Sequence, residues 1–220
     1  MNKSMLKDKI WGIWCGLPHS RINQTRAHEA ARKKLTCDME DASIMAVNCV
    51  GGEISNALGL RFNSPLINTS MKRNDFVKLV CDLEEYMNSE VTYSMVNGEV
   101  IASIKDITIR FVHDDDISSA KAGFERRKSR INYDKLILIL DDQGLSEDNL
   151  KKFNDIKCFR KICLTSSREL ADKYPCCFLM EEYEGEPQVG KYQYKDISGL
   201  HHFEKTWDYV SFLNEQMNLV

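Results

Sequence analysis

His113 is the residue best suited to proton transfer in this chain, because it directly follows the alternating apolar pattern of residues 107–112. An imidazole changes charge near neutral pH, and at the end of a strand it is well placed to act as a general acid or base. The alternative is a histidine that caps the next helix or bonds to neighbouring carboxylates. We take His113 as the candidate catalytic residue.

A candidate anion site lies at residues 48–52, where an apolar run passes into a helical pattern through the sequence Asn-Cys-Val-Gly-Gly. Glycines allow backbone conformations that a Cβ forbids, and a helix start presents free N–H groups and the positive end of its dipole. Asn48, Gly51 and Gly52 are therefore candidate ligand-binding residues. The alternative is that the glycines only form a tight turn. We interpret Cys49 as a buried structural thiol.

A basic run follows later, with Arg126, Arg127, Lys128 and Arg130 in a helical pattern. Arg126 and Arg130 are one helical turn apart, whereas Arg127 points elsewhere, so these side chains do not all serve one ligand. The planar guanidinium suits a phosphate or a carboxylate. The alternative is an ordinary solvated basic face.

The composition excludes several classes of function. Lys plus Arg number 30 against 33 Asp plus Glu, which gives a formal charge of −3 without a long block of one sign, so bulk charge indicates no nucleic-acid partner. The apolar runs are far too short to cross a bilayer, and they allow at most peripheral membrane contact. The glycine patterns of dinucleotide-binding proteins and the Gly-x-Ser-x-Gly elbow of many hydrolases are both missing.

Cysteine usage indicates a reduced, cytoplasmic protein. Eight cysteines are present, several of them lie within apolar patterns, and the first residues carry no apolar export segment. No Cys-x-x-Cys pair occurs, and the adjacent Cys176 and Cys177 would point to opposite faces of a strand. We expect no metal site from them.

Strand and helix patterns alternate along the chain, which is typical of an α/β protein. The expected strands are residues 10–15, 43–47, 91–95, 100–104, 107–112, 136–140, 161–165 and 177–180. The expected helices are residues 21–35, 53–60, 75–86, 117–131, 146–153 and 202–216. We predict a three-layer αβα domain with a mainly parallel sheet, interrupted by one β-hairpin at Asn97-Gly98. With 43% apolar residues and no repeat, residues 1–220 are expected to form a single domain.

Ligands of open α/β sheets gather at the carboxyl ends of the strands. Here those ends are residues 48–52, 113–116, 141–142 and 165–167, and their convergence would place an imidazole, carboxylates and hydroxyls in one pocket. The aspartates at 114–116 could bind a divalent cation, although acidic residues at a helix start more often cap the helix.

Three segments of the chain together resemble an uncharacterised bacterial family, a domain of unknown function commonly labelled exopolysaccharide biosynthesis protein. They are residues 48–65 with their Gly-Gly, Leu-Gly-Leu and Asn-Ser-Pro motifs, residues 106–113, and residues 124–132. The ending Trp207-Asp208-Tyr209 is similar too, so residues 43–214 form the family-like core and residues 1–40 a peripheral N-terminal extension. The chain departs from the family pattern at Asp114, where an aromatic residue is usual, and at Phe124, where a tryptophan is usual.

The resemblance implies an α/β fold and a role in surface polysaccharide assembly. The positions that match the family's motifs are Asn48, Gly51, Gly52, Ser64, His113, Arg127 and Arg130. We therefore expect a cytoplasmic transferase that moves a glycosyl, acyl or phosphoryl group from an activated sugar or acyl donor to a saccharide acceptor. Neither the residues nor the resemblance assigns a cofactor.

Two alternatives remain open. A non-catalytic assembly factor of a polysaccharide-synthesis complex would present an apolar patch, around Trp207, Tyr209 and Phe212, and would lack a deep polar pocket at the strand ends. A carbohydrate esterase or hydrolase would need a serine, such as Ser64 or Ser166, within hydrogen-bond reach of His113.

Overall fold

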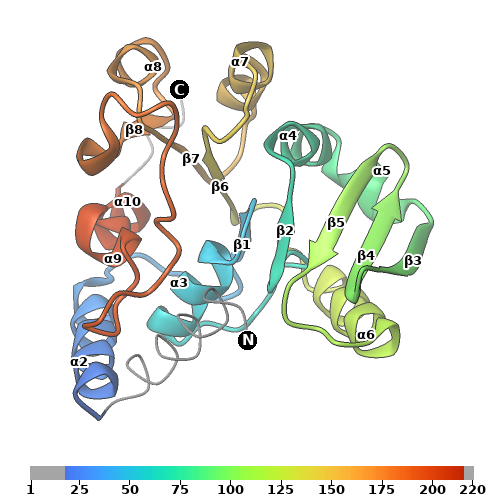
Figure 1. The fold of residues 1–220 in the computed structure, drawn as a ribbon, viewed down its shortest axis with the longest axis horizontal. Coiled ribbons are helices and arrows are strands. Elements are labelled where there is room, and N and C mark those ends of the chain that lie inside the picture. The colour runs from blue at the N-terminus through green and yellow to red at the C-terminus, as the bar shows by residue number, and fades with distance from the viewer. Residues whose placement is uncertain (1–17, 216–220) are drawn as a thin grey trace, which may run out of the picture.

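The structure is a computed structural model, and it describes residues 18–215. The strand expected at residues 10–15 lies outside the described residues. Figure 1 shows the arrangement of the elements. In chain order they are α2 (Pro18–Lys34), β1 (Ser43–Ala46), α3 (Val50–Leu58), β2 (Thr69–Met71), α4 (Arg73–Cys81), α5 (Leu83–Asn88), β3 (Val91–Val96), β4 (Glu99–Ile104), β5 (Ile107–Phe111), α6 (Ile117–Lys128), β6 (Leu136–Asp141), α7 (Glu147–Asp155), β7 (Arg160–Thr165), α8 (Arg168–Lys173), β8 (Cys177–Leu179), a 3₁₀ turn (Glu181–Tyr183), α9 (Phe203–Thr206) and α10 (Tyr209–Asn214).

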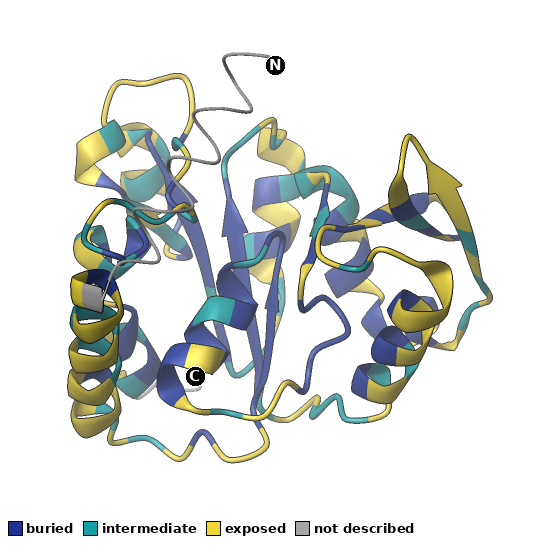
Figure 2. Ribbon diagram, turned by 60° about the horizontal axis from the view of Figure 1, so that its bottom comes forward, coloured by how far each residue is buried: buried dark blue, intermediate teal, exposed yellow. Residues whose placement is uncertain are grey.

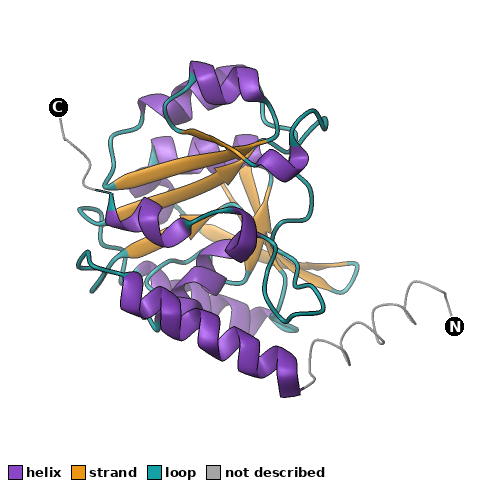
Figure 3. Ribbon diagram, turned by 90° about the vertical axis from the view of Figure 1, so that its left-hand side faces the viewer, coloured by secondary structure: helices purple, strands orange, loops and turns teal. Residues whose placement is uncertain are grey.

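The first sheet is parallel and has the order β1-β6-β7-β8. Its central strand β6 is buried at every residue, as its uninterrupted apolar sequence requires. Leu138 and Leu140 face one hydrophobic core, and Ile137 and Ile139 face another. Helices therefore cover both faces of this sheet, and the side view in Figure 3 shows the strands between helical layers. The prediction of an α/β fold with a parallel sheet is confirmed.

The second sheet is antiparallel and has the order β2-β5-β4-β3. The hairpin between β3 and β4 turns at Asn97 and Gly98, whose φ angles of 53° and 82° fit the tight turn predicted there. We had expected this hairpin to interrupt the parallel sheet. It instead belongs to the separate antiparallel sheet. The two sheets meet where the Met71 N–H of β2 donates to the Val47 carbonyl just after β1, at 3.1 Å.

Two of the expected helices are broken. The pattern at 75–86 forms α4 and α5, because Asp82 leaves helical geometry with φ −127° and ψ 42°. The pattern at 202–216 forms α9 and α10, because Trp207 is extended and Asp208 caps a new helix by accepting from the Ser211 N–H at 3.1 Å. Helical periodicity continues across both breaks, so apolar spacing alone did not reveal them.

Helix α2, which we assigned to a peripheral extension, packs against the rest of the molecule. Its Arg32 Nε donates to the Ala57 carbonyl near the end of α3 at 2.8 Å, and its Ala31 is buried in a hydrophobic core. The opposite face of the helix is exposed, as Figure 2 shows. Within residues 18–215, no helix has the length and hydrophobicity needed to span a membrane.

Candidate functional site

Asp141, the last residue of β6, connects three segments at the carboxyl end of the parallel sheet. It is fully buried and accepts two hydrogen bonds from Arg73, from Nε at 2.6 Å and from Nη2 at 2.8 Å. The Tyr192 hydroxyl donates to it at 2.8 Å, and the Asn48 amide at 3.3 Å. Burial opposes the charge of Arg73, but Asp141 outweighs burial and raises the pKa of the guanidinium. The pair is a buried, bidentate ion pair that fixes the strand end.

Asn48 forms the junction between β1 and α3. Its side-chain oxygen accepts from the Val50 N–H at 3.0 Å, and its amide also donates to the Tyr192 hydroxyl at 2.9 Å. The residue is 5% exposed and lines a pocket. Asn48 therefore positions the start of α3 and the loop that carries Tyr192.

Asp142 binds the next strand end. It accepts from the Thr165 hydroxyl at 2.8 Å and from the Ser166 N–H at 2.7 Å, and its other oxygen accepts from the Val189 N–H at 2.8 Å. The strand ends of β1, β6 and β7 thus converge, as expected for a parallel sheet. Both aspartates are occupied by contacts within the chain, which makes them structural.

A pocket of about 290 Å³ opens beside this junction, between the ends of the two sheets. It is lined by Asn48, Cys49, Glu53, Ser70, Arg110, Val112, His113, Gln193, Tyr194, Lys195 and His201. One wall is residues 192–201, which we call the wall segment. Most of the lining residues are polar or charged, but apolar atoms make up the larger part of the exposed lining surface. The pocket therefore suits a ligand that carries both polar groups and apolar faces.

His113 meets Cys49 at the mouth of this pocket. The Nε2 atom of His113 lies 3.8 Å from the Cys49 Sγ, although the two residues are 64 positions apart in the sequence. Burial raises the pKa of the Cys49 thiol, and the Glu53 carboxylate raises it further. We interpreted Cys49 as a structural thiol, and the structure instead places it against the candidate catalytic histidine.

Two cations and one carboxylate set the charge of the pocket. Arg110 projects from the solvent face of β5, where alternate residues are exposed, and Lys195 comes from the wall segment. Glu53 Oε2 lies 3.1 Å from His201 Nε2, a contact that becomes an ion pair when the imidazole is protonated. Burial opposes the charge of Glu53, but His201, together with Lys195 and His113, outweighs burial and lowers the pKa of the carboxyl group. With neutral histidines, Arg110 and Lys195 exceed Glu53 by one positive charge in the pocket.

The wall segment also presents an unused acceptor. The side-chain oxygen of Gln193 is buried and takes no hydrogen bond within the described residues. Tyr194, next to it, is 53% exposed at the rim. A buried acceptor without a donor is costly, and a ligand hydroxyl can satisfy this oxygen once the side chain turns toward the pocket.

Gly51 and Gly52 lie in the first turn of α3 but are not among the residues that line the pocket. A Cβ on Gly51 would come within 3.1 Å of the Ala46 Cβ and of the Ile44 carbonyl oxygen, so this glycine allows α3 to approach β1 closely. A Cβ on Gly52 would make ordinary contact with Ile67 at 3.5 Å. Gly51 thus has a clear packing role.

Ser64 and Arg130 lie at the opposite end of the parallel sheet from the pocket. Ser64 is buried, and its hydroxyl accepts from the Leu66 N–H at 3.2 Å. Both positions are tied to Ser43, the first residue of β1. The Ser43 hydroxyl donates to the carbonyl of Asn63, which precedes Ser64, and accepts from the N–H of Asn132, which closely follows Arg130. Neither candidate is therefore close to His113.

Arg127 is buried, with 8% of its surface exposed. Its Nη2 donates to the Ile67 carbonyl at 3.4 Å, and its Nε has no partner within the described residues. Burial lowers the pKa of the guanidinium, and Asp114 partly opposes that effect. Arg127 does not line the pocket, so of the proposed residues only Asn48 and His113 come together there.

Asp116 caps α6 by accepting from the Ser119 N–H at 2.9 Å, which is the capping role we had considered for the aspartates at 114–116. No group of three or more His, Cys, Asp or Glu side chains within residues 18–215 is arranged to hold a metal ion.

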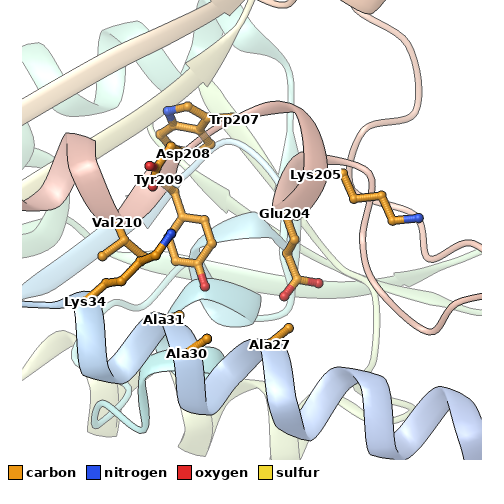
Figure 4. Close-up of a pocket in the computed structure, with 10 residues that line it drawn as sticks. All are labelled: Ala27, Ala30, Ala31, Lys34, Glu204, Lys205, Trp207, Asp208, Tyr209 and Val210. Carbon is orange, nitrogen blue, oxygen red and sulfur yellow. The ribbon is translucent and has the colours of Figure 1, made fainter.

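A second hollow, of about 370 Å³, lies between α2 and the segment formed by α9 and α10 (Figure 4). Its floor carries Ala27, Ala30 and Ala31 of α2, and Tyr209 faces them from above. Its acid Glu204 already pairs with His28 at 3.2 Å. The hollow is a packing groove between helices, and no strand-end residue reaches it.

Sequence reasoning missed the partners of His113. Arg110 occupies an outward position of an alternating strand that ends near His113, and this was the available signal. Lys195 and Gln193 lie in an irregular segment without a periodic pattern, and nothing in the sequence distinguished them.

The fold and the pocket define an α/β protein with a pocket at the strand ends, lined by two cations, one carboxylate and two histidines. The chain belongs to the family described as "Domain of unknown function (DUF1919)", whose model matches residues 19–214 and thus includes α2. The expectation of a domain-of-unknown-function family is confirmed. An uncharacterized protein of Haemophilus influenzae (strain ATCC 51907 / DSM 11121 / KW20 / Rd) is 24% identical over 186 residues, which cover 83% of this chain and 88% of that protein.

Proposed function

We propose that this protein is a transferase of surface polysaccharide assembly, which moves a glycosyl, acyl or phosphoryl group from an activated donor to a sugar hydroxyl. The observation that supports this proposal is the strand-end pocket, in which His113 lies with Arg110 and Lys195. A base beside two cations is the arrangement that transfer from an anionic donor needs. The polysaccharide context comes from the motif resemblance.

The donor side of the reaction belongs to Arg110 and Lys195. Activated sugar and acyl donors carry phosphate or diphosphate groups, which guanidinium and ammonium groups bind with charge-assisted hydrogen bonds. Arg110 has only a long, exposed contact with Glu99, at 3.4 Å, so it can turn to a ligand at little cost.

The acceptor side belongs to His113 and the wall segment. His113 takes the proton of the attacking hydroxyl, and the unused Gln193 oxygen accepts from a second hydroxyl of the sugar. Tyr194 offers an exposed ring at the rim, on which a sugar ring can lie.

The contacts favour this proposal over the two alternatives. Trp207 and Tyr209 are 3% and 5% exposed, so they do not form the apolar patch expected of an assembly factor. The Ser166 hydroxyl lies 3.2 Å from Asp142 and donates to the Glu186 carbonyl at 2.9 Å, and Ser64 lies at the far end of the sheet. An esterase of the expected kind would require one of these serines to contact His113, and neither does.

Thermal unfolding with a ligand panel tests the proposal. The panel contains nucleotide sugars, free nucleotides, coenzyme A and acetyl-coenzyme A. A ligand at 100 times its Kd stabilises the native state by about 2.7 kcal/mol, which for a chain of this length raises Tm by roughly 5–10 °C.

Arg110→Ala should remove the shift, and Arg126→Ala provides the matched control, because Arg126 is an exposed arginine outside the pocket. A shift that survives in Arg110→Ala but disappears in Arg126→Ala would place the donor elsewhere. The absence of any shift across the panel would contradict the proposal.

A further inference from the structure

Cys49 differs from the other cysteines within residues 18–215 in its surroundings. Its Sγ lies 3.8 Å from His113 Nε2, in a pocket, and the thiol is half-buried. Cys163 and Cys176 are buried in a hydrophobic core, and Cys81 is exposed on α4 without an imidazole contact. A thiol within reach of an imidazole is the arrangement of a base-activated nucleophile.

The local backbone places Cys49 at the start of a helix. Cys49 is the residue immediately before α3, so its side chain lies at the positive end of the helix. The amides of Gly51 and Gly52, in the first turn, have no acceptor among the described residues. Both glycines are buried and neither lines the pocket, so they fix the start of the helix behind Cys49 rather than contact a substrate.

We propose that Cys49 is a catalytic nucleophile and that the transferred group is an acyl group, carried on Sγ as a thioester, with His113 as the base. This inference rests on the proposed transferase function and names its substrate class as acyl thioesters or esters with an anionic carrier. The carrier is held by Arg110 and Lys195, which line the same pocket.

The reaction proceeds in two balanced steps. In the first, His113 Nε2 takes the thiol proton while Sγ attacks the donor carbonyl carbon; the bond to the carrier then breaks, and the carrier leaves with that proton. In the second, His113 takes a proton from the acceptor hydroxyl, whose oxygen attacks the thioester; the carbon–sulfur bond breaks, and Sγ takes the proton back. No oxidant, reductant or further reactant is needed.

The resting thiol is protonated. Burial and Glu53 both raise the pKa of Cys49, so a preformed thiolate is not the reactive species. Activation must come from proton removal during the attack, which makes the reaction depend on His113. Reagents that react only with thiolates will therefore label this cysteine slowly at neutral pH.

Acylation by p-nitrophenyl acetate tests the inference on the full chain. Release of p-nitrophenol gives the rate, and mass spectrometry of peptides locates the acetyl group. We expect acetylation of Cys49 and a loss of about 100-fold in its rate in His113→Gln, the lower end of what a general base contributes. Cys81, which is exposed on α4, is the internal reference. His113 is exposed, so we expect its replacement to preserve the fold.

Two results would overturn the inference: acetylation of Cys49 no faster than that of Cys81, or equal rates in wild type and His113→Gln. Cys49→Ala separates this inference from the proposed function. A ligand-induced rise in Tm that persists in Cys49→Ala, while the wild type fails to acetylate Cys49, would leave the transferase proposal in place and refute only the covalent step. Acetylation of Cys49 without any ligand-induced rise in Tm would support the covalent step and contradict the transferase proposal.

Discussion

Replacing Arg73 with alanine is expected to cost this protein a large part of its stability. Asp141 is fully buried and receives two of its hydrogen bonds from Arg73, whose side chain is only 15% exposed. The variant leaves the carboxylate buried without its cation, which typically costs about 3–5 kcal/mol. For a chain of 220 residues this corresponds to a fall in Tm of roughly 6–20 °C.

Arg168→Ala is the matched control. Arg168 binds Glu184 through the same pair of nitrogens, at 2.6 and 2.9 Å, but both side chains are substantially exposed. An exposed pair of this kind contributes about 0–1 kcal/mol. The two variants therefore lose the same kind of contact and differ mainly in its burial.

The stability of each variant is measured by urea titration. The set comprises Arg73→Ala, Arg168→Ala, Asp141→Asn and the double variant Arg73→Ala/Asp141→Asn. The double variant should be more stable than the sum of the two single losses predicts, with a coupling near the upper end of the range of about 0.5–3 kcal/mol found for contacting residues. A loss in Arg73→Ala no greater than that in Arg168→Ala would refute the assignment of Asp141 as the anchor of the strand end.

Two further predictions concern α3. Gly51→Ala should cost about 1–3 kcal/mol of unfolding free energy, because the new Cβ would be forced against β1. Gly52→Ala has room for a Cβ and should be neutral or stabilising by up to about 1 kcal/mol. Equal urea midpoints for the two variants would contradict this difference. Glu53 has a pKa below its ordinary value of 4.5, so its contribution is present above that value and is lost as the pH falls through the folded pKa. Urea midpoints from pH 7 to pH 3 should therefore fall more steeply for wild type than for Glu53→Gln, and parallel curves would show that the contact with His201 stabilises nothing.

The parallel sheet could be predicted because its signal is local. Residues 136–140 are apolar at every position, and only burial on both faces satisfies such a strand. The second sheet could not be predicted as a separate unit, because β2 has three residues, too few to show a period of two. Without β2, nothing in the sequence indicated that β5 pairs outside the parallel sheet.

The site could be predicted only in part, for a related reason. Asn48 and His113 were found because each follows an apolar strand, where ligands gather. Cys49 could not be paired with His113, since 64 residues separate them and only the contact between the two sheets brings them together. Arg130 matched a family motif, but a motif does not reveal the end of the sheet at which its residues lie.

The wall segment is held at several points, and this has a consequence for the thermodynamics of binding. Tyr192 is bound to Asp141, His201 lies against Glu53, and the Ile197 carbonyl accepts from the Ser20 hydroxyl at 3.3 Å. We therefore expect its backbone to be ordered before a ligand binds. Ordering on binding is confined to a few side chains, at about 0.5–1.5 kcal/mol each, rather than a whole loop. Ligands should therefore enter a preformed site. The small entropy loss leaves more of the contact energy available for binding.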